Sequence, residues 1–125
     1  MVPTLTSTIL LIEDEYNLRQ SLQLILKHAG YTVETLQNCS EAMDILGKCE
    51  IGLIILSIHN SDNTALSQLF YIRASFPHIP IMVLAANETP LLDWTTCGGA
   101  AVYLTKPVDP NLILAHITDI FGGHS

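Results

Sequence analysis

Positive charge is scarce in this sequence: five Lys and Arg residues stand against twelve Asp and Glu, and the net charge is −7. A surface of that sign repels nucleic acid and anionic membranes, so we expect the domain to bind neither by itself. Long apolar runs are missing as well, because no stretch approaches the roughly 20 residues that a membrane span needs. The opening residues, MVPTLTS, lack the basic and apolar regions of a signal peptide.

Cysteine is also scarce. Cys39, Cys49 and Cys97 form no CxxC pair, and an odd, scattered set favours reduced, partly buried thiols over a disulfide framework. We therefore expect a soluble protein with a cytoplasmic location.

Charged residues make up only 14% of the chain, whereas hydrophobic residues reach 49%, which excludes disorder. A chain of 125 residues suits one domain with a core of its own. We expect a flexible leader over residues 1–7, one domain over residues 8–121 and a short tail over residues 122–125.

Five compact apolar runs alternate with segments of helical period. Three of the runs are apolar at almost every position, as is typical of parallel strands that are covered on both faces. The predicted strands are Ile9–Ile12, Tyr31–Leu36, Ile51–Leu56, Ile79–Ala86 and Ala101–Leu104.

Helix signals mark the segments between these runs. One helix is predicted from about Tyr16 to a left-handed stop at Gly30, and a second follows Ser40, which we take as its N-cap. The inward stripes of these two helices are predicted to be Leu18, Leu22, Ile25 and Ala29, and Ala42, Ile45, Leu46 and Cys49.

Three more helices are predicted further along. The third begins near Asn63 and is closed by Pro77, and the fourth covers Pro90–Cys97. The fifth has Asp109 as its N-cap and Pro110 at its first position. The inward residues are predicted to be Ala65, Leu69, Ile72 and Phe76 in the third helix and Ile113, Ile117 and Ile120 in the fifth.

Five strands that alternate with five helices predict an α/β fold, a (βα)5 three-layer sandwich around a five-stranded parallel sheet. Right-handed crossovers leave few topologies, of which the flavodoxin-like order 2-1-3-4-5 is the commonest. In such sheets the site lies at the carboxyl ends of the strands, near the switch between the first and third strands.

Acids, a serine and a lysine follow the predicted strands. Glu13, Asp14 and Glu15 follow the first strand, Ser57 the third and Lys106 the fifth. Carboxylates beside a lysine suit a site that holds a cation or handles a phosphoryl group. A solvated acidic turn that meets a surface lysine explains the same pattern, and the pattern alone leaves both interpretations open.

Four fragments, in order, resemble the receiver domain of response regulators in two-component signalling. ILLIEDE resembles its first strand, GLIILSIHN its third, IPIMVLAAN its fourth and GGAAVYLTKPVDP its fifth. The resemblance spans about residues 8–121. It implies a phosphoacceptor aspartate at the end of the third strand, a magnesium ion and a cis bond before the proline of the last fragment.

Carried over residue by residue, the resemblance gives several positions a role. Glu13 and Asp14 match the magnesium-binding acids, and Lys106 matches the lysine that pairs with phosphate. His59 holds the position that supplies a backbone carbonyl to the metal, a role that does not depend on residue type. Tyr103 matches the aromatic switch residue.

One departure concerns the acceptor, because Ser57 stands where the resemblance implies aspartate. A serine hydroxyl is not ionised at pH 7 and needs a neighbouring base to become a nucleophile. Losing this carboxylate removes an oxygen ligand and lowers the demand for a cation, so magnesium binding by Glu13 and Asp14 is expected to be weak or lost. Lys106 is then expected to pair with Asp14 or Glu13.

A second departure concerns the switch. Ala85 stands where the resemblance implies Thr or Ser, whose hydroxyl follows the phosphoryl group. Its small side chain leaves room for Tyr103 to lie inward permanently. Trp94, the only tryptophan, lies on the predicted fourth helix and either anchors a partner or covers a short helix.

Together these residues predict a non-enzymatic pseudo-receiver that works through protein contacts and without phosphorylation. The expected partners are other signalling proteins or an attached output domain, through the face made by the fourth helix, fifth strand and fifth helix, with a homodimer as a further assembly. No cofactor is expected beyond weakly bound magnesium. Two alternatives stay open: a sensor of a small anion or metabolite in the vacated pocket, and a residual phosphoryl acceptor that uses Ser57.

Overall fold

A computed structural model describes residues 8–58, 63–85 and 101–122. The predicted helix Pro90–Cys97 with Trp94, the leader over residues 1–7 and residues 123–125 of the tail lie outside these ranges. The elements, in order, are β1 (Thr8–Ile12), α1 (Tyr16–His28), β2 (Thr32–Leu36), the 3-10 helix η1 (Cys39–Glu41), α2 (Ala42–Lys48), β3 (Leu53–Ile58), α3 (Asn63–Ser75), β4 (Ile81–Ala85), β5 (Val102–Thr105) and α5 (Pro110–Gly122).

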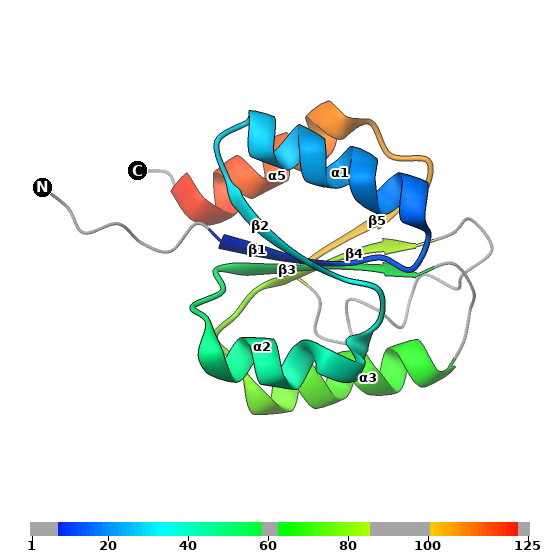
Figure 1. Ribbon diagram of the computed structural model, residues 1–125, viewed down its shortest axis with the longest axis vertical. Helices are drawn as coiled ribbons and strands as arrows, with labels where there is room; N and C mark the ends of the chain where they lie inside the picture. Colours follow the sequence, from blue (N-terminus) through cyan, green and yellow to red (C-terminus); the bar gives the residue numbers. More distant parts are fainter. Residues whose placement is uncertain (1–7, 59–62, 86–100, 123–125) are drawn as a thin grey trace, which may run out of the picture.

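The five strands form one parallel sheet in the order β2-β1-β3-β4-β5. This order confirms the predicted flavodoxin-like topology. Figure 1 shows α1 and α5 on one side of the sheet and α2 and α3 on the other, so the sheet is the middle of three layers. None of the helices in the described ranges is long and apolar enough to cross a membrane.

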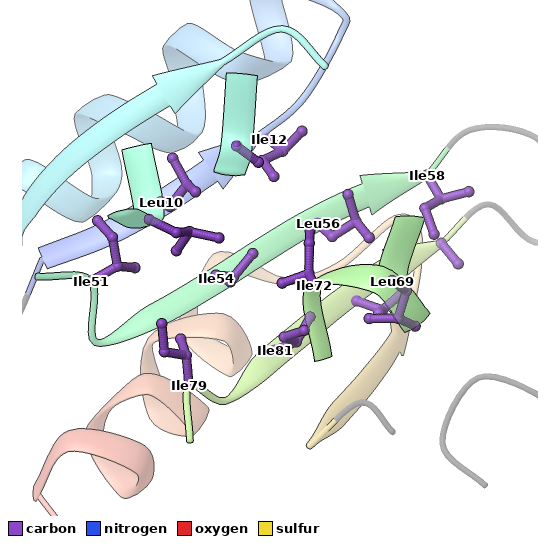
Figure 2. Close-up of a cluster of buried hydrophobic side chains, with 14 residues drawn as sticks. Leu10, Ile12, Ile51, Ile54, Leu56, Ile58, Leu69, Ile72, Ile79 and Ile81 are labelled. Atoms are coloured by element: carbon purple, nitrogen blue, oxygen red, sulfur yellow. The ribbon is translucent and has the colours of Figure 1, made fainter. Parts of the chain in front are cut away.

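Alternation along each strand divides the core into two clusters, since successive strand side chains point to opposite faces. We call them the α2/α3 core and the α1/α5 core after the helices that cover them; Figure 2 shows the first. The α2/α3 core comprises Leu10, Ile12, Ala42, Leu46, Ile51, Ile54, Leu56, Ile58, Leu69, Ile72, Ile79, Ile81, Val83 and Ala85. The α1/α5 core comprises Ile9, Leu11, Leu22, Leu26, Val33, Leu53, Ile55, Met82, Leu84, Ile113 and Ile117.

β3 lies further along the chain than predicted. It covers Leu53–Ile58 instead of Ile51–Leu56, because its pairing with β4 continues through Ser57↔Leu84 and Ile58↔Ala85. Ile51 is buried but precedes the paired residues. Ser57 is therefore part of the sheet and does not simply follow a strand.

α1 begins at Tyr16 as predicted, but its inward stripe is rotated. Leu22 and Leu26 are the buried residues, whereas Ala29 is exposed. Leu22 belongs to the predicted stripe, and Leu18, also predicted, packs against the α1/α5 core, so the prediction is wrong at Ala29 and misses Leu26. Gly30 has a φ of 104°, and its amide donates to Lys27 O at 2.9 Å, which confirms the predicted left-handed stop.

The entry to α2 differs from the prediction. Ser40 is not the N-cap of this helix, because η1 comes first and the Asn38 side chain accepts a hydrogen bond from the Ser40 amide at 2.9 Å. α2 then begins at Ala42 without a side-chain cap. Ala42 is buried as predicted, whereas Cys49 lies after the helix and is exposed.

α3 and α5 follow the prediction more closely. α3 begins at Asn63, and α5 begins at Pro110 behind Asp109, whose Oδ1 accepts a hydrogen bond from the Asn111 amide at 2.9 Å. Among the predicted inward residues, Leu69, Ile72, Ile113 and Ile117 are buried, Phe76 and Ile120 are partly buried, and the Ala65 side chain lies outside the described residues.

Candidate functional site

Glu13 is the first residue after β1, and its backbone is held from two sides. Its amide donates to Leu36 O at 3.0 Å, which continues the β1–β2 pairing by one residue. Its carbonyl accepts a hydrogen bond from Arg19 Nη1 at 2.7 Å. The side chain is 0% exposed, so the carboxylate is buried at the carboxyl edge of the sheet.

The Glu13 carboxylate faces Lys106, the first residue after β5. Glu13 Oε1 lies 3.6 Å from Lys106 Nζ, and Glu13 Oε2 accepts a hydrogen bond from the Glu15 amide at 2.9 Å. A buried charge is costly unless it is paired and hydrogen-bonded. The structure thus pairs Lys106 with Glu13, one of its two predicted partners.

This ion pair reaches across the sheet. Lys106 is anchored beside β4, because its amide donates to Ala85 O at 2.7 Å. Two strands, β3 and β4, lie between β5 and β1, at about 4.8 Å per strand step. The extended lysine and glutamate side chains therefore meet over the strands between them.

Burial and nearby charges shift the pKa of Lys106 in opposite directions. Its side chain is 17% exposed, and this burial lowers the pKa of the ammonium group below its ordinary value. The negative charges of Glu13, Asp14 and Glu15 raise the pKa again, and Glu13 contributes most of the three. The glutamate is thus the group that chiefly favours the charged lysine.

Ser57 lies on the α1/α5 side of β3, the same side as the ion pair. Its strand neighbours Leu56 and Ile58 belong to the α2/α3 core, and its register partner Leu84 belongs to the α1/α5 core. The Ser57 Oγ atom is buried and has no hydrogen-bond partner within the described ranges. No base among those residues is thus placed to accept its proton.

The three acids after β1 differ in their burial and hydrogen bonds. Asp14 is exposed, whereas the Glu15 side chain caps α1 by accepting hydrogen bonds from the Leu18 amide at 2.7 Å and the Asn17 amide at 3.3 Å. Sequence analysis missed this role, since Ser, Thr, Asp and Asn are the usual N-caps. The signal available was the position of Glu15 directly before the first helical residue.

The described donors do not fit the magnesium ion that the resemblance implies. Mg²⁺ takes oxygen ligands in near-octahedral geometry, yet the Glu13 carboxylate is turned toward Lys106 and the Glu15 amide. Within residues 8–58, 63–85 and 101–122, no three His, Cys, Asp or Glu side chains lie close enough together to hold a metal. His59, whose carbonyl was a predicted ligand, lies outside those ranges, and weak magnesium binding stays a prediction.

Ala85 and Tyr103 lie on the opposite side of the sheet from the ion pair. In the register of β4 and β5, Val83 is the partner of Tyr103, and Ala85 is the partner of Thr105. The Tyr103 ring packs against the α2/α3 core, and its hydroxyl oxygen is buried, which raises the pKa of the phenol. The ring therefore lies inward in this structure, while its role as a switch remains a prediction.

One protein family matches nearly the whole chain. The profile described as "Response regulator receiver domain" matches residues 9–118. The chain belongs to this family. The Lys106–Pro107 bond of this receiver domain is cis, as the resemblance implied.

Curated relatives of the receiver domain are transcriptional and regulatory proteins. "Cell cycle transcriptional regulator CtrA" of Caulobacter vibrioides is 32% identical over 110 residues, which are 87% of this chain and 48% of the relative. "Regulatory protein VanR" of Enterococcus faecium is 31% identical over 114 residues, which are 90% of this chain and 49% of the relative. The chain thus spans about half the length of these two relatives.

Among solved structures, chemotaxis protein CheY4 of Vibrio cholerae has the same fold. It superposes with a TM-score of 0.79 at 25% sequence identity, and the match covers 93% of this chain and 99% of that one. The likeness agrees with the parallel strand order β2-β1-β3-β4-β5 of this receiver domain.

Proposed function

We propose that this receiver domain works in two-component signalling without being phosphorylated at its third strand, and that it acts through protein contacts. The observation that carries the proposal is Ser57, at the position where the resemblance implies the phosphoacceptor aspartate. Its hydroxyl oxygen is buried and has no described hydrogen-bond partner. A neutral hydroxyl without a base is a weak nucleophile, so attack on a phosphodonor is not favoured.

The state of Lys106 supports the same proposal. The lysine that would pair with a phosphoryl group is 3.6 Å from the buried Glu13 carboxylate. A phosphoryl group or small anion would have to compete with this carboxylate for the ammonium group. The ion pair therefore argues against both alternatives, the residual acceptor and the anion sensor.

The partners we propose are other signalling proteins or an output domain joined to the receiver domain. The contact face would include β5 and α5, where Leu112 is 45% exposed; the predicted fourth helix lies outside the described residues. We propose that the domain has no enzymatic activity of its own. The expected cytoplasmic location belongs to the same proposal.

A phosphodonor assay tests the proposal directly. The chain is incubated with acetyl phosphate or a phosphohistidine donor, with and without Mg²⁺, and its intact mass is measured. We expect no labelling, because Ser57 cannot form an acyl phosphate. Stoichiometric, magnesium-dependent labelling would refute the proposal, and an acid-stable adduct on Ser57 would support the residual-acceptor alternative.

The magnesium affinities of the natural chain and of Ser57→Asp test the proposed weak metal site. Calorimetry should give a magnesium affinity weaker than millimolar for the natural chain, and Ser57→Asp should bind the ion more tightly because it adds a hard oxygen ligand. Sub-millimolar binding by the natural chain would contradict the proposed weak site.

A further inference from the structure

Arg19 connects the surface of α1 with the residue that carries the buried carboxylate. It lies in the first turn of α1, and its side chain is partly buried. Figure 1 shows α1 in an outer layer of the molecule, on the same side of the sheet as α5. From this layer the Nη1 atom of Arg19 reaches the end of β1 and donates a hydrogen bond to the Glu13 carbonyl at 2.7 Å.

A second contact holds the guanidinium group of Arg19. Its Cζ atom lies 5.5 Å from the centroid of the Tyr16 ring, within the roughly 6 Å at which the face of an aromatic ring attracts a cation. Tyr16 is 62% exposed, so this ring is at the surface of the helix. The backbone amide of Arg19 also donates to Glu15 O at 2.9 Å. Backbone and side chain together fix where Nη1 lies.

The backbone of Glu13 sets the direction of its carboxylate. The Glu13 amide donates to Leu36 O at 3.0 Å, and the Glu13 carbonyl accepts from Arg19. With both peptide groups held, the Cα–Cβ bond has one direction, and Oε1 comes to lie 3.6 Å from Lys106 Nζ. The bond from Arg19 is charge-assisted and therefore stronger than a neutral one. It is also the one of the two that a side chain supplies, so a substitution can remove it.

We propose that Arg19 is a positioning residue: through the Glu13 carbonyl it holds the Glu13 carboxylate opposite Lys106, and the Tyr16 ring holds Arg19 in place. The exposed start of α1 is thereby coupled to the buried ion pair. This inference deepens the proposed function, in which Glu13 competes with an anion for the lysine, and it rests on that function only for its significance.

A simpler role for Arg19 would be to stabilise the first turn of α1. Two backbone amides distinguish the two roles. The Glu15 amide donates to Glu13 Oε2 at 2.9 Å, so its protection reports the position of the carboxylate. The Leu18 amide donates to Glu15 Oε1 at 2.7 Å, so its protection reports the start of the helix.

NMR of the 125-residue chain tests the proposal. Arg19→Met should raise the hydrogen-exchange rate of the Glu15 amide about tenfold, the effect of losing one hydrogen bond, and leave the Leu18 amide nearly unchanged. It should also shift the Lys106 Nζ resonance in the direction in which Glu13→Gln shifts it. In the Glu13→Gln background, Arg19→Met should shift this resonance no further, because the carboxylate is already absent.

The matched control is Lys27→Met, which removes the same charge from an exposed site on the same helix. It should leave the Glu15 amide and the Lys106 resonance as they are in the natural chain. Tyr16→Phe, which keeps the ring, should also match the natural chain. Tyr16→Ala should act in the same direction as Arg19→Met and more weakly.

Several results would overturn the proposal. Arg19→Met could leave the Lys106 resonance in place, speed exchange at Glu15 and Leu18 alike, or act no more strongly than Lys27→Met. Equal spectra for the two Tyr16 variants would overturn it as well. None of these measurements uses a phosphodonor, so labelling by acetyl phosphate would refute the proposed function and leave the role of Arg19 standing.

Discussion

The two sides of the sheet differ most at its carboxyl edge. On the α1/α5 side this edge carries a buried ion pair, Glu13 with Lys106, and the buried Ser57 hydroxyl. On the α2/α3 side the same edge carries Ala85, which is 0% exposed, and the inward ring of Tyr103. One side is thus polar and the other apolar, although the same strands contribute to both.

This difference separates the two departures from the family pattern. Ser57 lies beside the α1/α5 core, and Ala85 belongs to the α2/α3 core. Restoring an acid at position 57 would change the polar side and leave the packing around Tyr103 as it is. The acceptor position and the switch position therefore lie in different surroundings, and each can be substituted without changing the other.

The largest effects are expected from the cores themselves. Leu69→Ala in the α2/α3 core and Ile117→Ala in the α1/α5 core remove side chains that are 0% exposed, and each should cost about 2–5 kcal/mol of unfolding free energy. Urea unfolding should remain one transition in both variants, because the strands between the cores are shared. Two separate transitions would mean that the sides unfold independently.

The ion pair should give the next largest effect. Glu13→Gln leaves the Lys106 ammonium, 17% exposed, without its main counter-charge, and we expect a loss of about 1–3 kcal/mol. Lys106→Met should be less costly in the Glu13→Gln background than alone, since the pair is already broken. Additive losses in this double-mutant cycle would show that the 3.6 Å contact contributes no stability.

The same variant changes the titration of Lys106. Burial already lowers the pKa of this lysine, and Glu13 opposes that shift, so Glu13→Gln should lower the pKa further. A lysine whose pKa is lower in the folded state makes stability rise as pH increases from the folded pKa to the ordinary value of about 10.4. NMR titration of the Lys106 side chain measures this directly, and an unchanged pKa would contradict the assigned pair.

A smaller effect is expected from Ala85→Thr on the apolar side. Two added heavy atoms at a 0% exposed site should cost about 1–2 kcal/mol and displace the Tyr103 ring. Its pKa, which burial now raises, should move back toward the ordinary value in a spectrophotometric titration. Ala42→Thr, in the same core but on α2, is the control: it should destabilise the fold without changing the tyrosine titration.

The smallest effect concerns Cys39, a partly buried thiol that packs against the α2/α3 core. Burial raises its pKa from 9.0 to about 11, so the unfolded chain releases this proton first. Stability should therefore fall as pH rises from about 9 to 11. Cys39→Ala should make this slope shallower.

Much of the fold could be predicted because local signals coincide with it. Apolar runs predicted the strand order, and breakers such as Gly30 and Pro110 correctly predicted the end of α1 and the start of α5. The extent of β3 could not be predicted, because pairing with β4 decides that Ser57 is a strand residue. The inward stripe of α1 was likewise wrong at Ala29, since contact with the sheet sets which side of a helix is buried.

The residues of the site could be predicted from the sequence, but the interactions between them could not. The strand order placed Glu13 and Lys106 at one edge, but the sequence could not show how strongly Glu13 and Asp14 each act on the pKa of the lysine. That difference depends on burial, because the Glu13 carboxylate lies inside and acts most strongly, whereas Asp14 is exposed and acts less. The capping role of Glu15 was hidden for the same reason, because three consecutive acids look alike until the backbone orients them.

The Glu13–Lys106 pair also has a consequence for folding kinetics. It joins residues that follow β1 and β5, and β3 and β4 lie between these strands. We expect the two charges to meet only once the long-range parallel pairing is in place, so that their contact forms after the folding barrier. Contacts absent from the folding transition state slow unfolding and leave the folding rate nearly unchanged. The ion pair should therefore act on the lifetime of the folded domain, and Glu13→Gln should shorten that lifetime without slowing folding.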